Sequence, residues 1–421
     1  MSESIPFGFI NLNIHINKNI LMRKIQLSII TAFILFISFS PSVNTIRGAE
    51  KASTEVTDFV KGPYLLYPAN NTKMMILWQT SSTNTCTVDW GTDSNCYSGS
   101  KATVEYGTAH QHKIMLDGLT PGTKYYYRVT TNNACTKASN FISGPTDTSR
   151  VVSFYAYGDT RSYPATHDLV AKKIMDEVSL NPKSQSLIIM SGDLVQTGDS
   201  EDSWTKEFFL PTYTNIQNML SKLPYLATMG NHEGQGLLFA KYFPYPMYAS
   251  GRYYYSFDYG PVHFTVLDQY TSYTEGSAQY SWLVNDLAAS SKPWKIILDH
   301  EPGWTAYGAS GVHGNNTTIQ TVVQPLCKKY GVSFIISGHN HFYSRANVDN
   351  VMHITSGGGG APFYTPTMQQ YIVIMDKSNH FCKIDINKNV LKFTAERSDG
   401  SIIESFDYVS TISDVIDVKQ N

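Results

Sequence analysis

The chain has 421 residues, of which 42% are apolar, and its formal net charge at pH 7 is −2. This length allows two or three domains, and the apolar content, with 28 tyrosines and 20 phenylalanines, is enough for sizeable cores. The nearly balanced charge gives no electrostatic basis for a nucleic-acid polymer as partner.

The N-terminal segment is typical of a secretory signal. Met22-Arg23-Lys24 provides a positive region, and the mostly apolar run 25–39 follows it. That run is short for a membrane-spanning helix and is broken by Ser40-Pro41-Ser42, which favours a cleaved signal over an uncleaved anchor. We therefore expect residues 1–49 to form a signal region that is cleaved between Ser40 and Ala49, leaving no membrane span in a secreted or extracytoplasmic protein (periplasm or cell surface). A translation start at Met22 would make the residues before it superfluous.

Residues 58–145 are predicted to form an all-β sandwich. Short β-prone runs alternate with turn clusters such as Thr120-Pro121-Gly122-Thr123, as in sandwich domains. The runs are 74–78, 87–90, 112–116 and 125–129. The sequence segment Gly118–Val129 resembles fibronectin type III-like domains. We expect this domain to act as a packing scaffold. A substrate-selecting or adhesive role is the alternative.

Five cysteines without a C-x-x-C pair fit a secreted protein better than a metal–thiolate cluster. Three of them, Cys86, Cys96 and Cys135, fall in the predicted β domain. The other two, Cys327 and Cys382, fall beyond it. A disulfide among the first three and another between the last two both remain open, and one thiol must be left over.

From Val151 onward the pattern alternates between strands and helices. Helices are predicted over 166–178, around Trp282 and over 317–330, so the strands between them should be at least partly parallel. The glycine run 357–360 does not precede a helix, so we expect a tight backbone passage beside the site rather than a phosphate loop.

Five short apolar runs each lead into a loop that begins with a residue able to bind a metal. Near-continuous apolar runs bounded by glycine suit strands buried on both faces, and ligands bind beyond the carboxyl ends of such strands. The loops are therefore expected to converge on one site. Their polar residues are Asp159, Asp193, Asn231, His232, His300, His339 and His341. Oxygen ligands combined with imidazole suit Zn, Fe or Mn.

The order of these motifs along the chain resembles the calcineurin-like metallophosphoesterases, and within them the purple acid phosphatase branch. The motifs are Gly158-Asp159, Gly192-Asp193, Gly230-Asn231-His232-Glu233, an isolated His300 and Gly338-His339-Asn340-His341, and the stretches Tyr253–Asp268 and Gln279–His300 are similar to that branch as well. The resemblance implies an α/β fold of two packed mixed sheets with helices outside. It places this catalytic domain at 150–400, after a sandwich like that of plant-type purple acid phosphatases, and leaves 401–421 as a C-terminal extension.

The resemblance also implies two metal ions, expected to be divalent (Zn, Mn or Fe), and a small phosphorylated substrate. The implied ligands are Asp159 and His341 at the first metal, Asn231, His300 and His339 at the second, and Asp193 as the bridge between them. Metal-activated water would attack the phosphate. His232 would stabilise the developing charge or protonate the leaving oxygen.

The chain departs from the family pattern at two positions. Gln196 stands where purple acid phosphatases carry a metal-binding tyrosine, and Arg161 stands where other members carry a histidine. The first metal thus keeps three recognised protein ligands: either it binds weakly, or Gln196 or waters complete its shell. Arg161 could grip a phosphate oxygen or pair with a nearby carboxylate. His313 is expected to contact the substrate, with an exposed loop residue as the alternative.

These residues predict a metal-dependent phosphoric ester hydrolase resembling the acid phosphatases, acting on phosphomonoesters. A phosphodiesterase is the nearest alternative because the missing tyrosine blurs the branch assignment. A secreted adhesion module with a degraded metal site is the alternative from another class, and the intact set of metal-binding residues argues against it. The sequence leaves the natural substrate and the oligomeric state open.

Overall fold

The computed structural model describes residues 58–410, apart from 83, 132–133, 136–137, 249–251 and 309–310. The predicted signal region lies outside these residues, as does the chain beyond 410. Within the described part, every helix is too short or too polar to cross a membrane.

The predicted β-prone runs of the N-terminal region all lie in strands, and these strands belong to two sheets. One sheet contains β4 (Gly99–Thr103), β3 (Cys86–Gly91), β7 (Lys124–Thr131) and β8 (Ala134–Cys135), with β9 (Ser139–Ile142) also paired to β7. The other contains β1 (Phe59–Leu66), β2 (Met74–Thr80), β6 (Gln111–Leu116) and β5 (Glu105–Tyr106). Alternate side chains of β7, such as Tyr127 and Val129, are buried with Trp78 and Phe141 in a core of their own.

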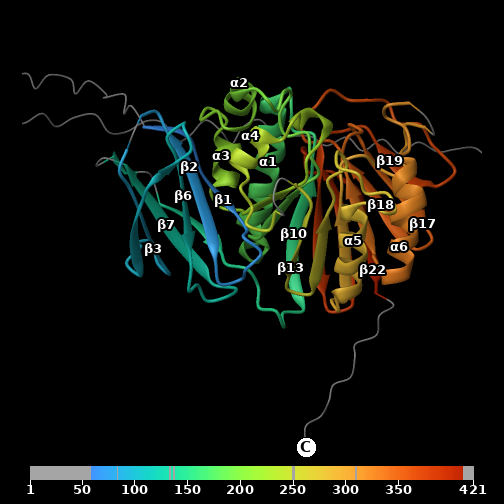
Figure 1. The fold of residues 1–421 in the computed structure, drawn as a ribbon, viewed down its shortest axis with the longest axis horizontal. Helices are drawn as coiled ribbons and strands as arrows, with labels where there is room; N and C mark the ends of the chain where they lie inside the picture. Colours follow the sequence, from blue (N-terminus) through green and yellow to red (C-terminus); the bar gives the residue numbers. More distant parts are fainter. Residues whose placement is uncertain are drawn as a thin grey trace, which may run out of the picture. The chain divides into compact units, whose positions relative to one another are not determined.

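The second of these sheets continues into the C-terminal half of the chain, because β1 pairs in parallel with β12 (Tyr225–Ala227). The continuous sheet has ten strands in the order β22-β21-β20-β10-β11-β12-β1-β2-β6-β5. Figure 1 shows β1, β2 and β6 on one side of β10 and β22 on the other. Its remaining strands are β10 (Val151–Tyr157), β11 (Leu187–Met190), β20 (His380–Asn387), β21 (Val390–Arg397) and β22 (Ile402–Val409). β22 pairs with β21 beyond residue 400, so the sheet extends past the position where the sequence prediction ends the catalytic domain.

A seven-stranded sheet packs against this one across a shared core. Its order is β13 (Tyr255–Tyr259), β14 (Val262–Val266), β15 (Trp294–Leu298), β16 (Phe334–Ser337), β18 (Val351–Ser356), β17 (Tyr343–Val348) and β19 (Ile372–Asp376). Phe154 of β10 meets Phe264 of β14 with ring centroids 5.2 Å apart. On β16, Phe334 and Ile336 enter the shared core, whereas Ile335 faces a second core on the other side of the sheet. This explains why the run is apolar without alternation.

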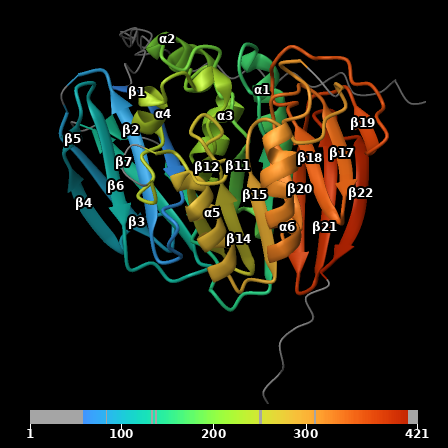
Figure 2. The same ribbon diagram turned by 45° about the vertical axis from the view of Figure 1, so that its right-hand side comes forward.

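Helices cover the outer faces of the two sheets, so the predicted fold class is confirmed. The long helix α1 (Pro164–Leu180) buries Val170 and Ile174, as its apolar stripe predicts. In Figure 2, α5 (Ala278–Ala289) and α6 (Gln324–Tyr330) lie in front of strands of the seven-stranded sheet. The shorter elements are α2 (Glu201–Ser203), α3 (Thr214–Leu220), α4 (Leu237–Tyr242), 3₁₀ turns at Pro182–Ser184 and Asn231–Glu233, and π-helical turns at Trp204–Phe208 and Ile319–Val323.

The structure answers one of the two open questions about disulfides. Cys327 and Cys382 are separate buried thiols, so no disulfide joins them. Cys86 is also a buried free thiol, whereas the side chain of Cys135 lies outside the described residues. His353 is buried and bonds Gln324 through Nε2, so it is a core histidine.

Candidate metal centre

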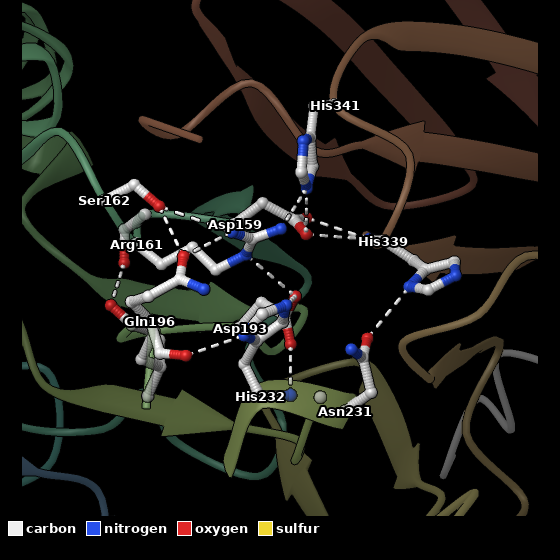
Figure 3. Close-up of polar contacts among 12 residues, drawn as sticks. Asp159, Arg161, Ser162, Asp193, Gln196, Asn231, His232, His339 and His341 are labelled. Atoms are coloured by element: carbon white, nitrogen blue, oxygen red, sulfur yellow. Dashed lines mark hydrogen bonds and ion pairs between the residues drawn. The ribbon is translucent and has the colours of Figure 1, made fainter. Parts of the chain in front are cut away.

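The predicted convergence of strand ends is observed. β10, β11 and β12 are parallel neighbours in one sheet, and β15 and β16 are parallel neighbours in the other. The loops that follow these five strands carry every residue named above as a metal ligand. Figure 3 shows the side chains of Asp159, Asp193, Asn231, His339 and His341 close together, and His300 Nε2 lies 3.1 Å from Asn231 Oδ1. Their roles as metal ligands remain proposals.

Three of these residues share an unusual backbone conformation. Asp159, Asp193 and His339 have φ angles of 59°, 54° and 67°, and each directly follows a glycine. A positive φ is uncommon outside glycine and persists only where surrounding contacts hold it, as functional sites often require. Here the amide of Asp159 donates to the carbonyl of Gly192, and the amide of His339 donates to the Asp159 carboxylate.

The glycine run 357–360 is the tight passage that the sequence predicts. A Cβ on Gly357 would lie 2.3 Å from the carbonyl oxygen of Asn340 and 2.9 Å from Asp159 Oδ2. The amide of Gly359 donates to the carbonyl of Gly158, which precedes Asp159. The run therefore supports the loop that carries Asp159 and has no room for side chains at Gly357.

Asp193, Asn231, His300 and His339 form what we call the second ligand cluster. Asn231 Oδ1 lies 3.1 Å from His300 Nε2 and 3.0 Å from His339 Nδ1. The two ring nitrogens are 3.3 Å apart, and Asp193 Oδ1 is 3.3 Å from His300 Nε2. Four ligands at about 2.1 Å from a tetrahedral zinc would be separated by roughly 3.4 Å, so these spacings suit one metal ion.

The hydrogen bonds of the two histidines decide which ring atoms face this cluster. His300 Nδ1 is 2.7 Å from the carbonyl oxygen of Ser191, and His339 Nε2 is 2.8 Å from the carbonyl oxygen of Val312. A carbonyl only accepts, so both of these nitrogens carry their proton. In the neutral rings, the opposite nitrogens therefore point lone pairs at each other and at Asn231 Oδ1.

Lone pairs gathered in this way need a cation or a proton between them. Burial lowers the pKa of His300, but the Asp193 carboxylate outweighs it and raises that pKa to about 10. Burial and His300 lower the pKa of His339 to about 4. One proton on His300 can thus fill the cluster, and a metal ion would displace it. The donor set fits such an ion.

Asp159, Asp193 and His341 form the first ligand cluster, and their candidate ligand atoms all lie within 4.8 Å of one another. All three side chains are buried. His341 Nδ1 donates to the carbonyl oxygen of Pro362 at 2.5 Å, which leaves the lone pair on Nε2 facing the cluster. Asp159 Oδ1 lies 3.5 Å from this Nε2 atom.

The side chain of Arg161 enters the first ligand cluster. Its Nε lies 3.3 Å from Asp193 Oδ2 and its Nη2 lies 3.3 Å from His341 Nε2. Its Nη1 donates to Gln196 Oε1 at 2.6 Å. Arg161 thus pairs with the Asp193 carboxylate, and its contact with a phosphate oxygen remains a proposal. Gln196 faces this cluster, as its position predicts, but its oxygen is bound to the guanidinium.

His232 is held at the rim of the site. Its Nδ1 donates to the backbone carbonyl of Gln196 at 2.7 Å, so Nε2 is the free ring atom. Nε2 lies 3.8 Å from Asp193 Oδ2, and 23% of the side chain is exposed. The backbone amide of His232 donates to Asp193 Oδ1 at 2.9 Å. The ring thus borders both ligand clusters and remains open to solvent.

Glu233 is a supporting residue that the sequence analysis missed. Its fully buried carboxylate accepts backbone amides of Asp193, Leu194 and Gly230 at 2.9, 2.8 and 2.6 Å. Burial, with the Asp193 charge nearby, raises its pKa to about 7. One side chain therefore ties the loop after β11 to the loop after β12. Its place directly after Asn231-His232 was the only available signal.

His313 and Tyr364 form an aromatic wall beside the histidine ligands. The His313 ring centroid is 4.7 Å from that of His339 and 4.4 Å from that of Tyr364. Tyr364 stacks on His341 at 4.3 Å with an interplanar angle of 16°. His313 is therefore close to the site, and its contact with substrate remains a proposal. Tyr364, more than 20 residues beyond His341, carried no sequence signal.

Two known protein families match consecutive parts of the chain. The calcineurin-like phosphoesterase family matches residues 153–343, and the purple acid phosphatase N-terminal domain matches residues 60–156. The chain therefore combines a calcineurin-like phosphoesterase domain with a purple acid phosphatase N-terminal domain. Enzymes of the metallophosphoesterase family are metal-dependent phosphoric ester hydrolases with a dinuclear metal centre.

Individual relatives carry the name of the same branch. Purple acid phosphatase 15 of Arabidopsis thaliana is 28% identical over 279 residues, which cover 58% of this chain and 51% of that protein. Purple acid phosphatase 23 of the same plant is 27% identical over 61% of this chain and 64% of its own length. The matches span about half to two thirds of these relatives.

Two solved structures share the fold. Purple acid phosphatase PPD1 from yellow lupin superposes with a TM-score of 0.69 over 83% of this chain and 74% of its own, at 18% identity. PhoD superposes with a TM-score of 0.64 over 84% and 90% of the two chains, at 14% identity. At these identities the likeness supports the arrangement of sheets and helices alone.

Proposed function

We propose that this protein is a secreted, metal-dependent phosphomonoesterase resembling the acid phosphatases. The observation that carries the proposal is the second ligand cluster, where lone pairs from two histidines and an asparagine meet beside a buried carboxylate. That geometry suits a bound ion and lies within a family of metal-dependent phosphoric ester hydrolases. An adhesion module would have no need of it.

The metal ligands are assigned by cluster. Asn231, His300 and His339, with Asp193, would hold one ion, and Asp159 and His341, with Asp193, would hold the other of a dinuclear centre. Bound metal ions supply an acidified water and neutralise charge on the phosphate. The ions are proposed to be divalent, because Gln196 offers a neutral amide where related enzymes carry tyrosine.

His232 is proposed to act on the phosphate rather than on a metal. Its Nδ1 proton is committed to the carbonyl of Gln196, so Nε2 is the atom that can carry or release a proton toward the site. A protonated Nε2 can stabilise developing negative charge or protonate the leaving oxygen.

A cleft of about 500 Å³ adjoins the second ligand cluster, and its size suits a small phosphate ester. Its lining is mostly polar and uncharged, with Asn231, Asn315, Asn316 and Thr317 together with one carboxylate, Glu301. Amide and hydroxyl groups of this kind favour a leaving group that can exchange hydrogen bonds with them. We propose that the ester lies in this cleft with its phosphate at the metals.

The test is hydrolysis of para-nitrophenyl phosphate and of its diester, bis(para-nitrophenyl) phosphate, after metal removal and readdition of Mn²⁺ or Zn²⁺. We expect metal-dependent release of nitrophenol from the monoester and much slower release from the diester. Faster cleavage of the diester would make the protein a phosphodiesterase. Absence of both activities, combined with absence of bound metal, would favour the adhesion module.

Secretion and the domain boundaries belong to the same proposal. Residues 1–49 would be removed during export, residues 58–145 would form the N-terminal β domain, and 150–400 the catalytic domain. N-terminal sequencing of protein from the extracytoplasmic fraction tests this. A mature protein that begins before Ser40, or that is found only in the cytoplasm, would contradict it.

A further inference from the structure

The acceptor atoms of the two ligand clusters have different partners. In the second cluster, Asn231, His300 and His339 direct acceptor atoms at one another. In the first cluster a permanent cation is already present. The guanidinium of Arg161 donates to Asp193 and to the Nε2 lone pair of His341, two of the three candidate ligands.

The position of this guanidinium is fixed by contacts on its other edge. Nη1 donates to Gln196 Oε1 at 2.6 Å and to Ser162 Oγ at 3.3 Å. Ser162 Oγ in turn donates to the same Gln196 oxygen at 2.7 Å. The backbone amides of Ser162 and Gln196 both donate to Glu207 Oε2, at 2.8 and 2.9 Å. These contacts therefore hold the Arg161 side chain in place, and only 8% of the residue is exposed.

A metal ion in the first cluster would have to compete with this arrangement. It would need the Asp193 and His341 atoms that the guanidinium binds, and two cations would then share one small buried volume. A guanidinium keeps its charge in proteins, so Arg161 cannot make room for a metal ion by losing a proton. Moving it away breaks buried, charge-assisted hydrogen bonds.

We propose that the Arg161 guanidinium occupies the first metal position as a built-in cation. The protein then binds one metal ion tightly, at the second ligand cluster, and a second ion only by displacing Arg161. This inference rests on the proposed function for the second cluster. It revises the expectation of two equivalent ions. Arg161 stands where other family members carry a histidine, and its guanidinium fills the space in which the first ion would bind.

The test is metal stoichiometry of the full chain, stripped with chelator and titrated with Mn²⁺ by calorimetry. We expect one tight ion per chain, with any second ion bound at least about 100-fold more weakly, the scale of breaking a buried ion pair. Arg161→His and Arg161→Ala should each bring the second ion to within about 10-fold of the first. Electron paramagnetic resonance should change from an isolated to a spin-coupled Mn²⁺ signal.

Controls separate this inference from the proposed function. Arg397→Ala removes an arginine that pairs with Asp376, outside the ligand clusters, and should leave one tight ion. Asn231→Ala should lower the affinity of the chain for that ion. Two tight ions in the unaltered chain would overturn the role of Arg161 while leaving the phosphoesterase proposal intact. No tight ion in the unaltered chain would overturn both, and unchanged stoichiometry in the folded Arg161 variants would overturn the role of Arg161 alone.

Discussion

Asp193 is the residue on which both ligand clusters depend. One carboxylate oxygen lies 3.3 Å from His300 Nε2, and the other lies 3.3 Å from Arg161 Nε. Burial raises the pKa of Asp193, but His300 and His232 outweigh burial, so the group stays ionised in the folded protein. We predict that Asp193→Ala loses the tightly bound metal. Elemental analysis after gel filtration tests this, and full metal retention would show that the ligand clusters have been misassigned.

His232 should behave in the opposite way. Its ring touches Gln196 and approaches Asp193, but it supplies no atom to either ligand cluster. We predict that His232→Ala keeps its metal content and lowers kcat by roughly 10²–10⁴, the usual scale of general acid–base catalysis. The measurement pairs elemental analysis with turnover of para-nitrophenyl phosphate. Lost metal or unaltered turnover would refute the assignment.

Gln196 leads to a prediction about colour. Tyrosinate bound to ferric iron gives the resembling enzymes their purple colour, and an amide oxygen cannot act as that donor. Gln196 Oε1 is moreover engaged by Arg161 and Ser162. We predict a protein without strong visible absorption when purified without added metal. A purple preparation with stoichiometric ferric iron would require another tyrosine in the shell.

Side-chain neighbours were harder to predict than the ligand set. The set follows from strand ends, because each ligand lies in the loop that follows an apolar run. The position of the Arg161 guanidinium depends on its side-chain rotamer and on Glu207, which holds the loops around it. No spacing in the sequence marks Glu207 for this role. The roles of Glu233 and Tyr364 were missed, because Glu233 acts through backbone amides although it stands in a motif, and Tyr364 acts through ring stacking.

Strand order, at the scale of secondary-structure elements, was predictable only in part. Apolar runs and alternating helices predicted parallel strands and helices on the outer faces, and both are present. The sequence could not order β20, β21 and β22, which pair beside β10 although more than 200 residues separate them from it. Antiparallel pairing at such separation depends on which edge is free, and no local pattern encodes that.

An ion pair between elements supplies a pH-dependent prediction. His263 on β14 bonds Asp258 of β13 at 2.8 Å and Asp286 of α5 at 3.1 Å. Burial lowers the pKa of His263, but the two carboxylates outweigh it and raise the pKa to about 9 from the ordinary 6.5. Since the folded pKa is the higher one, this stabilisation is complete below about pH 6.5 and is lost as the pH rises through 9.

We therefore predict that His263→Ala lowers the free energy of unfolding by about 3 kcal/mol at pH 6 and by less at pH 9.5. Urea unfolding at the two pH values measures the difference. His353→Ala is the matched control, because burial lowers the pKa of that histidine to about 3 and it is neutral at both pH values. An equal loss in the His263 variant at both pH values would contradict the ion-pair assignment.

The molecule as a whole joins its two regions more closely than the sequence predicted. The sequence indicated a separate sandwich, yet β1 pairs with β12, and the ten-stranded sheet crosses the boundary. Leu66 and Leu77 lie in the same core cluster as the strands that lead to the metal centre. Local β patterns identify strands but not their partners in another region, so this continuity was beyond the reach of the sequence.

The shared sheet predicts how the folded part of the chain unfolds. Tyr64 on β1 donates to the carbonyl of Tyr242 at 2.8 Å and packs on Phe209 with ring centroids 5.0 Å apart, so its removal opens a cavity between the regions. We predict one calorimetric transition for the full chain. Tyr64→Ala should lower its midpoint and destabilise the protein by about 3–5 kcal/mol. Two separate transitions, or a soluble and active fragment beginning near Val151, would show that the N-terminal region is dispensable. A single transition would instead mean that the sandwich supports the metal centre by completing the sheet on which its loops are built.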